Sequence, residues 1–138
     1  MDGFDSGPAT ADDHAVIDRA IDAFNAEKTG IDDSRPVGIS IRDESGRLVG
    51  GLKGTTGLGW LHVAVIWLDE GHRGRGLGAE LLRRAENVAR ERGCRGVCLT
   101  SFSFQAPGFY TRRGYQIFGE LEEYPPGESL FFLRKTIK

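Results

Sequence analysis

Residues 60–68 form an apolar stretch in which His62 is the only polar residue. Valine, isoleucine and tryptophan occur repeatedly in it, and these residues are typical of strands. Because polar and apolar positions do not alternate, the pattern favours a strand that is buried on both faces. We therefore predict a central strand here.

The segment that follows has the apolar spacing of a helix. Its apolar positions are Leu77, Leu81, Leu82, Ala85, Val88 and Ala89. Glu80 and Glu86 each stand four residues before an arginine, which is typical of ion pairs on the outer side of a helix. The pattern predicts an amphipathic helix that ends at Gly93.

Another amphipathic helix is predicted near the N-terminus, with a cap at Asp12 or Asp13 and an end near Gly30. Its predicted apolar face consists of Val16, Ile17, Ala20, Ile21 and Phe24. The opposite face is acidic. The small, acidic residues 1–11 indicate an irregular start or a short edge strand.

Alternating patterns predict strands over residues 37–42 and 47–53, joined by a hairpin turn at residues 43–46. A glycine-rich turn over residues 54–59 then leads into the central strand. These three strands would form an antiparallel meander.

After the second helix, residues 97–101 predict a further strand. Pro107 indicates the first turn of a short helix that ends at Gly114. Residues 115–121 and 130–137 predict a closing antiparallel pair.

The length of 138 residues suits one domain with its own core, and we expect residues 1–138 to form it. No apolar stretch is long enough to cross a bilayer, and no basic and then apolar leader follows Met1, so a cytoplasmic location is expected. Two cysteines, Cys94 and Cys98, are too few for a metal site, and we expect none. We expect neither a nucleic acid nor a membrane as a partner.

Charge is unevenly distributed. Residues 1–33 contain nine acidic and two basic residues, a net charge of −7, and the remainder has a net charge of +5. Residues 73–95 contain seven arginines and three glutamates, which suits a polyanionic cofactor. A solvated helix face is the simpler interpretation for Arg83, Arg84, Arg90 and Arg92.

Gly74, Gly76 and Gly78 lie between the central strand and its helix. Glycines allow successive N–H groups to point to one place, and the positive end of the helix dipole favours an anion there. We call residues 74–79 the cradle and predict that it binds a phosphate or a pyrophosphate.

One fingerprint that fits the cradle is Gly74-x-Gly76-x-x-Ala79, which matches the dinucleotide motif of a Rossmann fold. That motif calls for an acidic residue about 20 residues later, at the end of the next strand. Here the next strand ends in Thr100 and Ser101. A nucleotide-binding oxidoreductase fragment is therefore the weaker interpretation.

A second fingerprint is Arg-x-x-Gly-x-Gly/Ala, present from Arg73 to Gly78, five residues beyond Leu68. Ala106-x-x-Phe109-Tyr110-x-x-x-Gly114-Tyr115 follows after an intervening strand. Together the two motifs resemble those of the GNAT N-acetyltransferases, from about residue 39 to the C-terminus. The resemblance implies an α/β GNAT fold: a mixed, mostly antiparallel sheet with helices on both faces, whose central strand splays away from the next parallel strand.

The resemblance also implies an acetyl-CoA-dependent N-acetyltransferase that transfers the acetyl group to a primary amine of a small molecule or peptide by direct attack. Backbone groups of Ile66, Trp67 and Leu68 would pair with the pantetheine arm, and the Ile66 N–H would donate to the thioester carbonyl. Backbone N–H groups would bind the pyrophosphate at Gly74, Arg75, Gly76, Leu77, Gly78 and Ala79. Arg73 and Arg75 would support it by charge. Ser103 stands where the family often has an asparagine that contacts the cofactor arm.

Two residues are candidates for proton transfer. Tyr110 matches the family's general acid to the coenzyme A sulfur, and a core aromatic beside Phe109 is the weaker interpretation. His62 would lie on the same strand face as Ile66 and Leu68 and could act as a general base, directly or through water. A hydrogen-bonded structural histidine is the other interpretation of His62.

Three further points stay open at this stage. A non-catalytic acyl-CoA-binding module would keep the cradle and bind the cofactor without releasing thiol. If the acidic N-terminal helix faces the acceptor side, a cationic amine is favoured. Dimers are frequent in the family, which leaves a homodimer open.

Overall fold

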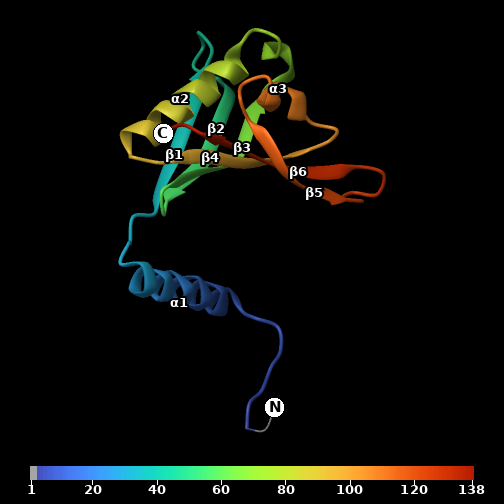
Figure 1. Ribbon diagram of the computed structural model, residues 1–138. Helices are drawn as coiled ribbons and strands as arrows, with labels where there is room; N and C mark the ends of the chain where they lie inside the picture. Colours follow the sequence, from blue (N-terminus) through green and yellow to red (C-terminus); the bar gives the residue numbers. More distant parts are fainter. Residues whose placement is uncertain (1–2) are drawn as a thin grey trace. The chain divides into compact units, whose positions relative to one another are not determined.

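The computed structural model describes residues 3–138, which divide into two compact units, one ending at Asp32 and one from Asp33 to Lys138 (Figure 1). Each unit is described by itself below. None of the helices in the described residues is both long and apolar enough to cross a membrane. The expectation of one domain over the whole chain stays a prediction, as does the cytoplasmic location.

The first unit contains one helix, α1 (Ala11–Thr29). Its N-cap is Thr10, whose side chain accepts from the Asp13 N–H while the Asp13 carboxylate accepts from the Thr10 N–H. The predicted cap at Asp12 or Asp13 was therefore wrong, because Asp13 serves as the third residue of a capping box. The helix ends at Gly30, whose left-handed conformation (φ 70°) favours glycine.

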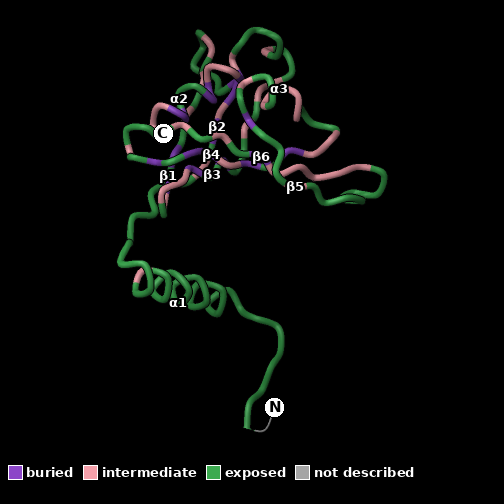
Figure 2. The backbone as a smooth tube through the Cα atoms, in the orientation of Figure 1, coloured by how far each residue is buried: buried purple, intermediate pink, exposed green. Residues whose placement is uncertain are grey.

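The apolar face of α1 is exposed to solvent in the chain (Figure 2). Val16, Ile17, Ile21 and Phe24 are between 51% and 57% exposed. Within the first unit, none of the residues of α1 is buried.

The second unit is a six-stranded sheet in the order β1-β2-β3-β4-β6-β5, and only β3 and β4 are parallel. The strands are β1 (Arg35–Arg42), β2 (Leu48–Gly57), β3 (Trp60–Leu68), β4 (Gly96–Phe102), β5 (Gln116–Glu122) and β6 (Ser129–Thr136). A 3-10 turn, η1 (Glu70–His72), precedes α2 (Leu77–Glu91), and α3 (Pro107–Thr111) follows β4. This mixed, mostly antiparallel architecture confirms the predicted fold class.

The core lies between one face of the sheet and α2. Leu81, Ala85 and Ala89 of α2 are fully buried, and they belong to one cluster with Leu61, Val97 and Leu133 of the sheet. The opposite face of β3 is exposed, since Val65 and Trp67 are 50% and 45% accessible to solvent. The prediction that the central strand is buried on both faces was therefore wrong.

β2 continues through Gly57, so the turn predicted over residues 54–59 is confined to Leu58 and Gly59. Gly54 faces Val63 in the ladder, and a Cβ on Gly54 would lie 2.5 Å from the carbonyl oxygen of His62. Glycine is required there by this close backbone approach and not by a turn.

A β-bulge lies in β3, where Val63 pairs with Gly54 and Val65 pairs with Lys53, which leaves Ala64 as the extra residue. A bulge reverses the alternation of faces beyond it. Ile66 and Leu68 consequently pack toward the core, on the side of Leu61 and Val63. The prediction that His62 shares their face was wrong, because His62 precedes the bulge.

Candidate active site

The two parallel strands separate in the middle of the sheet. The ladder of β3 and β4 ends at the pair of His62 and Cys98, although both strands continue beyond it. The predicted splayed strand pair is thus confirmed. Backbone groups of β3 beyond this point are available to a ligand that pairs like an added strand.

A cavity of about 680 Å³ occupies this gap. It is lined by Ala64, Val65, Ile66, Trp67, Leu68, Arg73, Gly78, Thr100, Ser101, Phe104, Gln105, Ala106, Phe109 and Tyr110. The structure therefore brings together six residues predicted from sequence: Ile66, Trp67, Leu68, Arg73, Gly78 and Tyr110.

The cradle lies at the N-terminus of α2. Gly74 and Gly76 have φ angles of 77° and 79°, which residues with a side chain rarely adopt. Gly76 is the N-cap, and within residues 3–138 no side chain caps this helix end. Its first N–H groups and the positive end of the helix dipole are therefore available to an anion.

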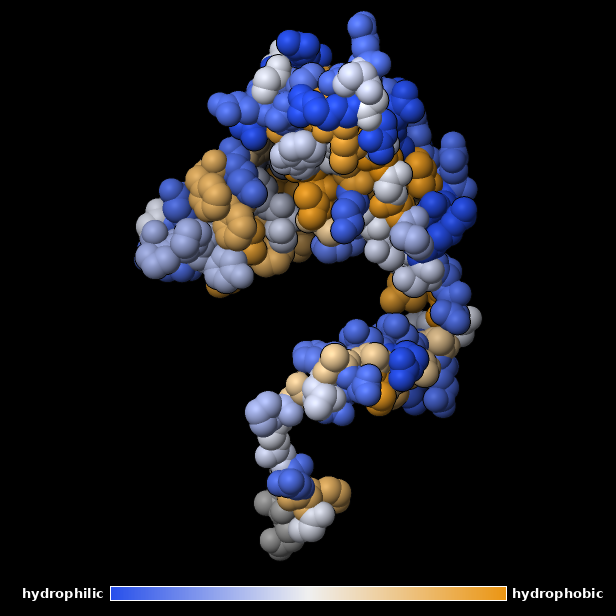
Figure 3. All heavy atoms as spheres, turned by 180° about the vertical axis from the view of Figure 1, so that it is seen from behind, coloured by the Kyte–Doolittle hydropathy of each residue, from blue (hydrophilic) through white to orange (hydrophobic). Residues whose placement is uncertain are grey.

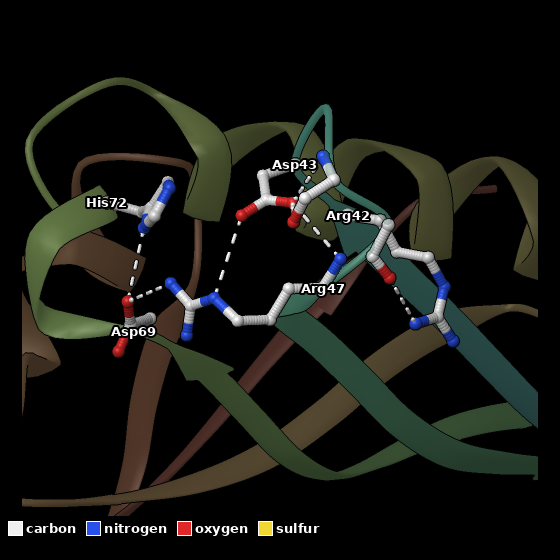
Figure 4. A network of polar contacts seen from close by, with 7 residues as sticks. Arg42, Asp43, Arg47, Asp69 and His72 are labelled. Atoms are coloured by element: carbon white, nitrogen blue, oxygen red, sulfur yellow. Dashed lines mark hydrogen bonds and ion pairs between the residues drawn. The ribbon is translucent and has the colours of Figure 1, made fainter.

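A polar network connects the β1–β2 turn to the loop that precedes the cradle (Figure 4). The Arg47 guanidinium contacts Asp43 at 3.6 Å and Asp69 at 3.3 Å. Asp69 also lies 3.3 Å from Nδ1 of His72. Hydrogen bonds from Arg47 and His72 lower the pKa of Asp69, so its carboxylate remains charged and holds this loop in place.

Tyr110 lies on α3 with its ring between two aromatic neighbours. The Phe109 ring is 5.1 Å away and the Tyr115 ring 5.9 Å, both in edge-to-face geometry. Burial raises the pKa of Tyr110 above its ordinary value, so its hydroxyl keeps its proton. Tyr110 therefore presents a protonated hydroxyl among the residues that line the cavity.

Tyr115 is itself held by a buried charge. Its hydroxyl donates to Glu86 Oε2 at 2.7 Å, and Lys135 donates to Glu86 Oε1 at 3.0 Å. Glu86 is only 7% exposed, whereas the sequence had placed it on the solvent side of α2 with Arg90. No local pattern predicts this network, because Tyr115 and Lys135 lie 29 and 49 residues from Glu86 along the chain.

Two predicted site residues lie elsewhere. His62 is exposed in the part of β3 that still pairs with β4, and it is not among the residues lining the cavity. Ser103 Oγ donates to Glu128 and accepts from the Ser129 N–H at 2.9 Å. Its hydroxyl thus holds the β5–β6 loop instead of facing the cavity.

An aromatic stack at the edge of the cavity was missed by the sequence reasoning. The Phe102 ring lies between Phe104, at 5.0 Å and 12°, and Tyr124, at 5.6 Å and 9°. Phe104 also lines the cavity. Tyr124 belongs to the β5–β6 loop, so the contact depends on a hairpin that closes far along the chain.

Three comparisons with known proteins indicate the family of this chain. The family model described as the acetyltransferase (GNAT) family matches residues 9–115. A blasticidin-S acetyltransferase from Streptomyces morookaense is 42% identical over 114 residues, which cover 80% of this chain and 84% of the relative. The crystal structure of an acetyltransferase from Bacillus cereus ATCC 14579 is 33% identical with a TM-score of 0.90, covering 99% of this chain and 100% of that one.

A more distant solved structure contains the acetyl donor. This structure is described as a streptothricin acetyltransferase from Bacillus anthracis str. Ames in complex with acetyl coenzyme A. It is 17% identical with a TM-score of 0.66, covers 75% of this chain and 63% of that one, and thus shares the fold.

The features of this chain fit the same donor. The cradle offers free N–H groups and positive charge to a pyrophosphate, and the gap beside β3 offers backbone groups to an extended arm. The chain belongs to the acetyltransferase (GNAT) family and is an N-acetyltransferase that uses acetyl-CoA.

Proposed function

We propose that the chain acetylates a small cationic amine by direct transfer, with Tyr110 as the general acid. The observation that carries the proposal is that Tyr110 and the backbone of Ile66 line one cavity between the cradle and the aromatic stack. Acetyl-CoA, when bound, supplies the acetyl group as an activated thioester. The chain's own residues bind it, orient it and move protons.

The donor would be held by backbone groups. N–H groups of Gly76, Leu77 and Gly78 are at the free N-terminus of α2 and would bind the pyrophosphate, with Arg73 beside them at the cavity. The Ile66 N–H would stabilise the oxyanion that develops during transfer. Ile66 is suited to this because it lies beyond the end of the β3–β4 ladder, where β3 pairs with β2 but no longer with β4.

Tyr110 would protonate the leaving thiolate. A thiol has an ordinary pKa of about 8.5 and a tyrosine one of about 10, so tyrosine is the weaker acid of the two. The proton transfer therefore needs a site that holds the tyrosine hydroxyl close to the sulfur. The raised pKa of Tyr110 keeps the phenol protonated at neutral pH. Its ring cannot shift easily, because Phe109 and Tyr115 pack against it.

The acceptor amine must also lose a proton. Among the described residues that line the cavity, none is a histidine or a carboxylate. We therefore propose that the proton leaves through water and that His62 is not the base. Substitution of His62 by Ala should accordingly change kcat/KM less than threefold, about 0.6 kcal/mol.

Charge and aromatic surface favour a cationic acceptor. Residues 116–133 include Glu120, Glu122, Glu123 and Glu128 and no lysine or arginine. The stacked rings in this region offer their faces to a cation or a planar group. The relative from Streptomyces morookaense is a blasticidin-S acetyltransferase, and we propose an acceptor of similar kind, an antibiotic-like amine.

Thiol release tests this proposal. Purified protein with acetyl-CoA is assayed against blasticidin S and against cationic, neutral and acidic amines, and the cationic group should be acetylated fastest. Preference for acidic amino acids would contradict the cationic acceptor. Tyr110→Phe should lower kcat by roughly 10²–10⁴-fold while acetyl-CoA affinity is kept. A non-catalytic acyl-CoA-binding module would instead bind acetyl-CoA and release no thiol with any amine.

A further inference from the structure

Glu86 on α2 is a buried carboxylate that lies outside the donor site. Hydrophilic residues cover much of the second unit's surface in the view of Figure 3, whereas Glu86 is only 7% exposed. A charge in such a place costs free energy unless it is paired and hydrogen-bonded. Glu86 is not among the residues that line the cavity. The reason for a carboxylate here must therefore be sought in its partners.

Two side chains from outside α2 donate hydrogen bonds to Glu86. The Tyr115 hydroxyl donates to Oε2 at 2.7 Å, and Lys135 Nζ donates to Oε1 at 3.0 Å. The Arg90 guanidinium lies farther away, at 3.9 Å. Each oxygen of the carboxylate thus has its own donor. These bonds tie α2 to β6, which contains Lys135, and to Tyr115, which directly precedes β5.

The helix that carries Tyr110 has little support of its own. α3 is five residues long, and none of its residues is buried. A helix of this length is not stable by itself. One of its contacts is made by the Phe109 ring, which would lie 3.4 Å from a Cβ on Gly78. Another is made by Tyr115, whose N–H donates to the Tyr110 carbonyl at 3.1 Å.

Tyr115 connects Tyr110 to the buried carboxylate. Its side chain is 3% exposed, and its ring lies 5.9 Å from the Tyr110 ring in edge-to-face geometry. Because its backbone bonds to Tyr110 and its hydroxyl bonds to Glu86, Tyr115 is held at both ends. A side chain fixed by packing and by a hydrogen bond can in turn fix its neighbour.

We propose that Glu86 is a positioning residue, which acts through Tyr115 to hold the Tyr110 hydroxyl where the leaving sulfur needs its proton. α2 begins at the cradle, so the helix that would bind the pyrophosphate would also set the place of the acid. Misplacement by about 1 Å can cost about 100-fold in rate. The catalytic part of this inference rests on the proposed role of Tyr110, whereas the restraint on its ring does not.

Steady-state kinetics of Tyr115→Phe test the catalytic part. The substitution keeps the ring that packs on Tyr110 and removes the hydrogen bond to Glu86. We expect kcat, counted per acetyl-CoA-binding site, to fall about tenfold, while the KM for acetyl-CoA stays unchanged. An unchanged kcat would overturn the positioning role.

A double substitution separates positioning from folding. In a Tyr110→Phe background no hydroxyl is left to position, so adding Tyr115→Phe should lower kcat by less than about twofold. A further tenfold loss would mean that Tyr115 does not act through Tyr110. Val97→Ala is a matched control, because Val97 is fully buried in the same core cluster as Tyr115 and does not line the cavity. It should keep kcat per binding site.

Variants of Glu86 test the carboxylate itself. Glu86→Gln keeps an oxygen that can accept from Tyr115 and should lower kcat by less than about threefold, whereas Glu86→Leu removes both acceptors and should lower it about tenfold. Equal losses would show that the charge beside Lys135 matters and not the acceptor for Tyr115, which overturns the proposal. If Glu86→Leu does not fold, Tyr115→Phe still decides the question.

Nuclear magnetic resonance tests the restraint on the ring without any acceptor. The chain has three tyrosines, Tyr110, Tyr115 and Tyr124, so ring-¹³C-labelled tyrosine gives few signals, which Tyr→Phe variants assign. The order parameter of the Tyr110 ring should fall in Tyr115→Phe. That of Tyr124 should stay the same, because Tyr124 stacks on Phe102. An unchanged order parameter of the Tyr110 ring would overturn the restraint.

These results distinguish the present proposal from the proposed function. If Tyr110→Phe keeps the kcat of the unaltered chain, or if no amine is acetylated, the proposed function fails and the order parameters still decide whether Tyr115 restrains the ring. If Tyr110→Phe is slow and Tyr115→Phe is not, the general acid stands and the positioning role of Glu86 fails.

Discussion

Helix α2 has a pronounced apolar face, whereas α1 has only a weak one, and the apolar side chains of the two helices differ in burial. Leu81 and Leu82 of α2 are at most 1% exposed, whereas the apolar side chains of α1 are more than half exposed. Their N-termini differ as well. Thr10 and Asp13 cap α1, while α2 starts at a glycine that leaves its N–H groups free. An apolar stripe predicts that a helix needs a partner, and only the rest of the chain decides whether it has one.

Truncating one apolar side chain in each helix should give the largest difference in the free energy of unfolding. Leu81→Ala removes a fully buried side chain and should lower the free energy of unfolding by about 2–5 kcal/mol. Ile17→Ala should cost below about 0.5 kcal/mol at low protein concentration, because Ile17 is exposed within one chain. Urea titrations of both variants measure this.

A substitution at the free N-terminus of α2 should affect binding. Gly76 has a φ of 79°, and an L-residue in this region costs about 1–2 kcal/mol. Gly76→Ala should therefore weaken acetyl-CoA binding about tenfold in calorimetric titration, which corresponds to about 1.4 kcal/mol. In the same loop, Gly71→Ala is a matched control, because its Cβ would approach only Asp69, at 4.0 Å. An unchanged acetyl-CoA affinity of the Gly76→Ala variant would contradict the proposal that the cradle binds the pyrophosphate.

The buried hydrogen bond from Tyr115 to Glu86 should make stability depend on pH. Burial, and then the hydrogen bond to Glu86, raise the pKa of Tyr115 above 10.0. A folded-state pKa above the unfolded value contributes stability that is complete below about pH 10 and is lost as the pH rises above it. Tyr115→Phe should cost about 1–2 kcal/mol at pH 7 and make unfolding less sensitive to pH above 10. Identical alkaline unfolding curves for the two proteins would contradict this.

A smaller effect than at Tyr115 is expected at the cap of α1. Thr10→Ala removes the side-chain acceptor of the capping box and should cost about 1 kcal/mol of helix stability. Circular dichroism should show reduced helicity, while acetyl-CoA affinity stays unchanged, because the anion site belongs to α2. Weaker acetyl-CoA binding in this variant would mean that α1 contributes to the donor site.

The strands and helices were predicted well where the signal is local. The run over residues 60–68 gave β3 with the bounds Trp60–Leu68, and the periodicity after the cradle gave α2. The cradle itself follows from glycines at fixed spacing. The same local reasoning wrongly predicted a turn at Gly54. Glycine is needed there because the backbone of Gly54 approaches that of His62 closely on the neighbouring strand.

The candidate site was predicted in part for the same reason. Motif spacing led to Tyr110 and the cradle, which line or adjoin one cavity. It could not reveal the bulge at Ala64, which turns His62 away from the face of Ile66. Nor could it reveal that Ser103 bonds to a loop 25 residues later, or that Phe102 stacks on Tyr124.

The sequence alone determined most of the elements, the glycine turn before α2 and the family, because these depend on residues within a few positions of one another. The tertiary structure decided which helix face is covered, where β3 parts from β4, and which side chains meet in the cavity. These features depend on pairings between distant segments. A single extra residue in a strand reverses the faces of all that follow it, and no local pattern records that event.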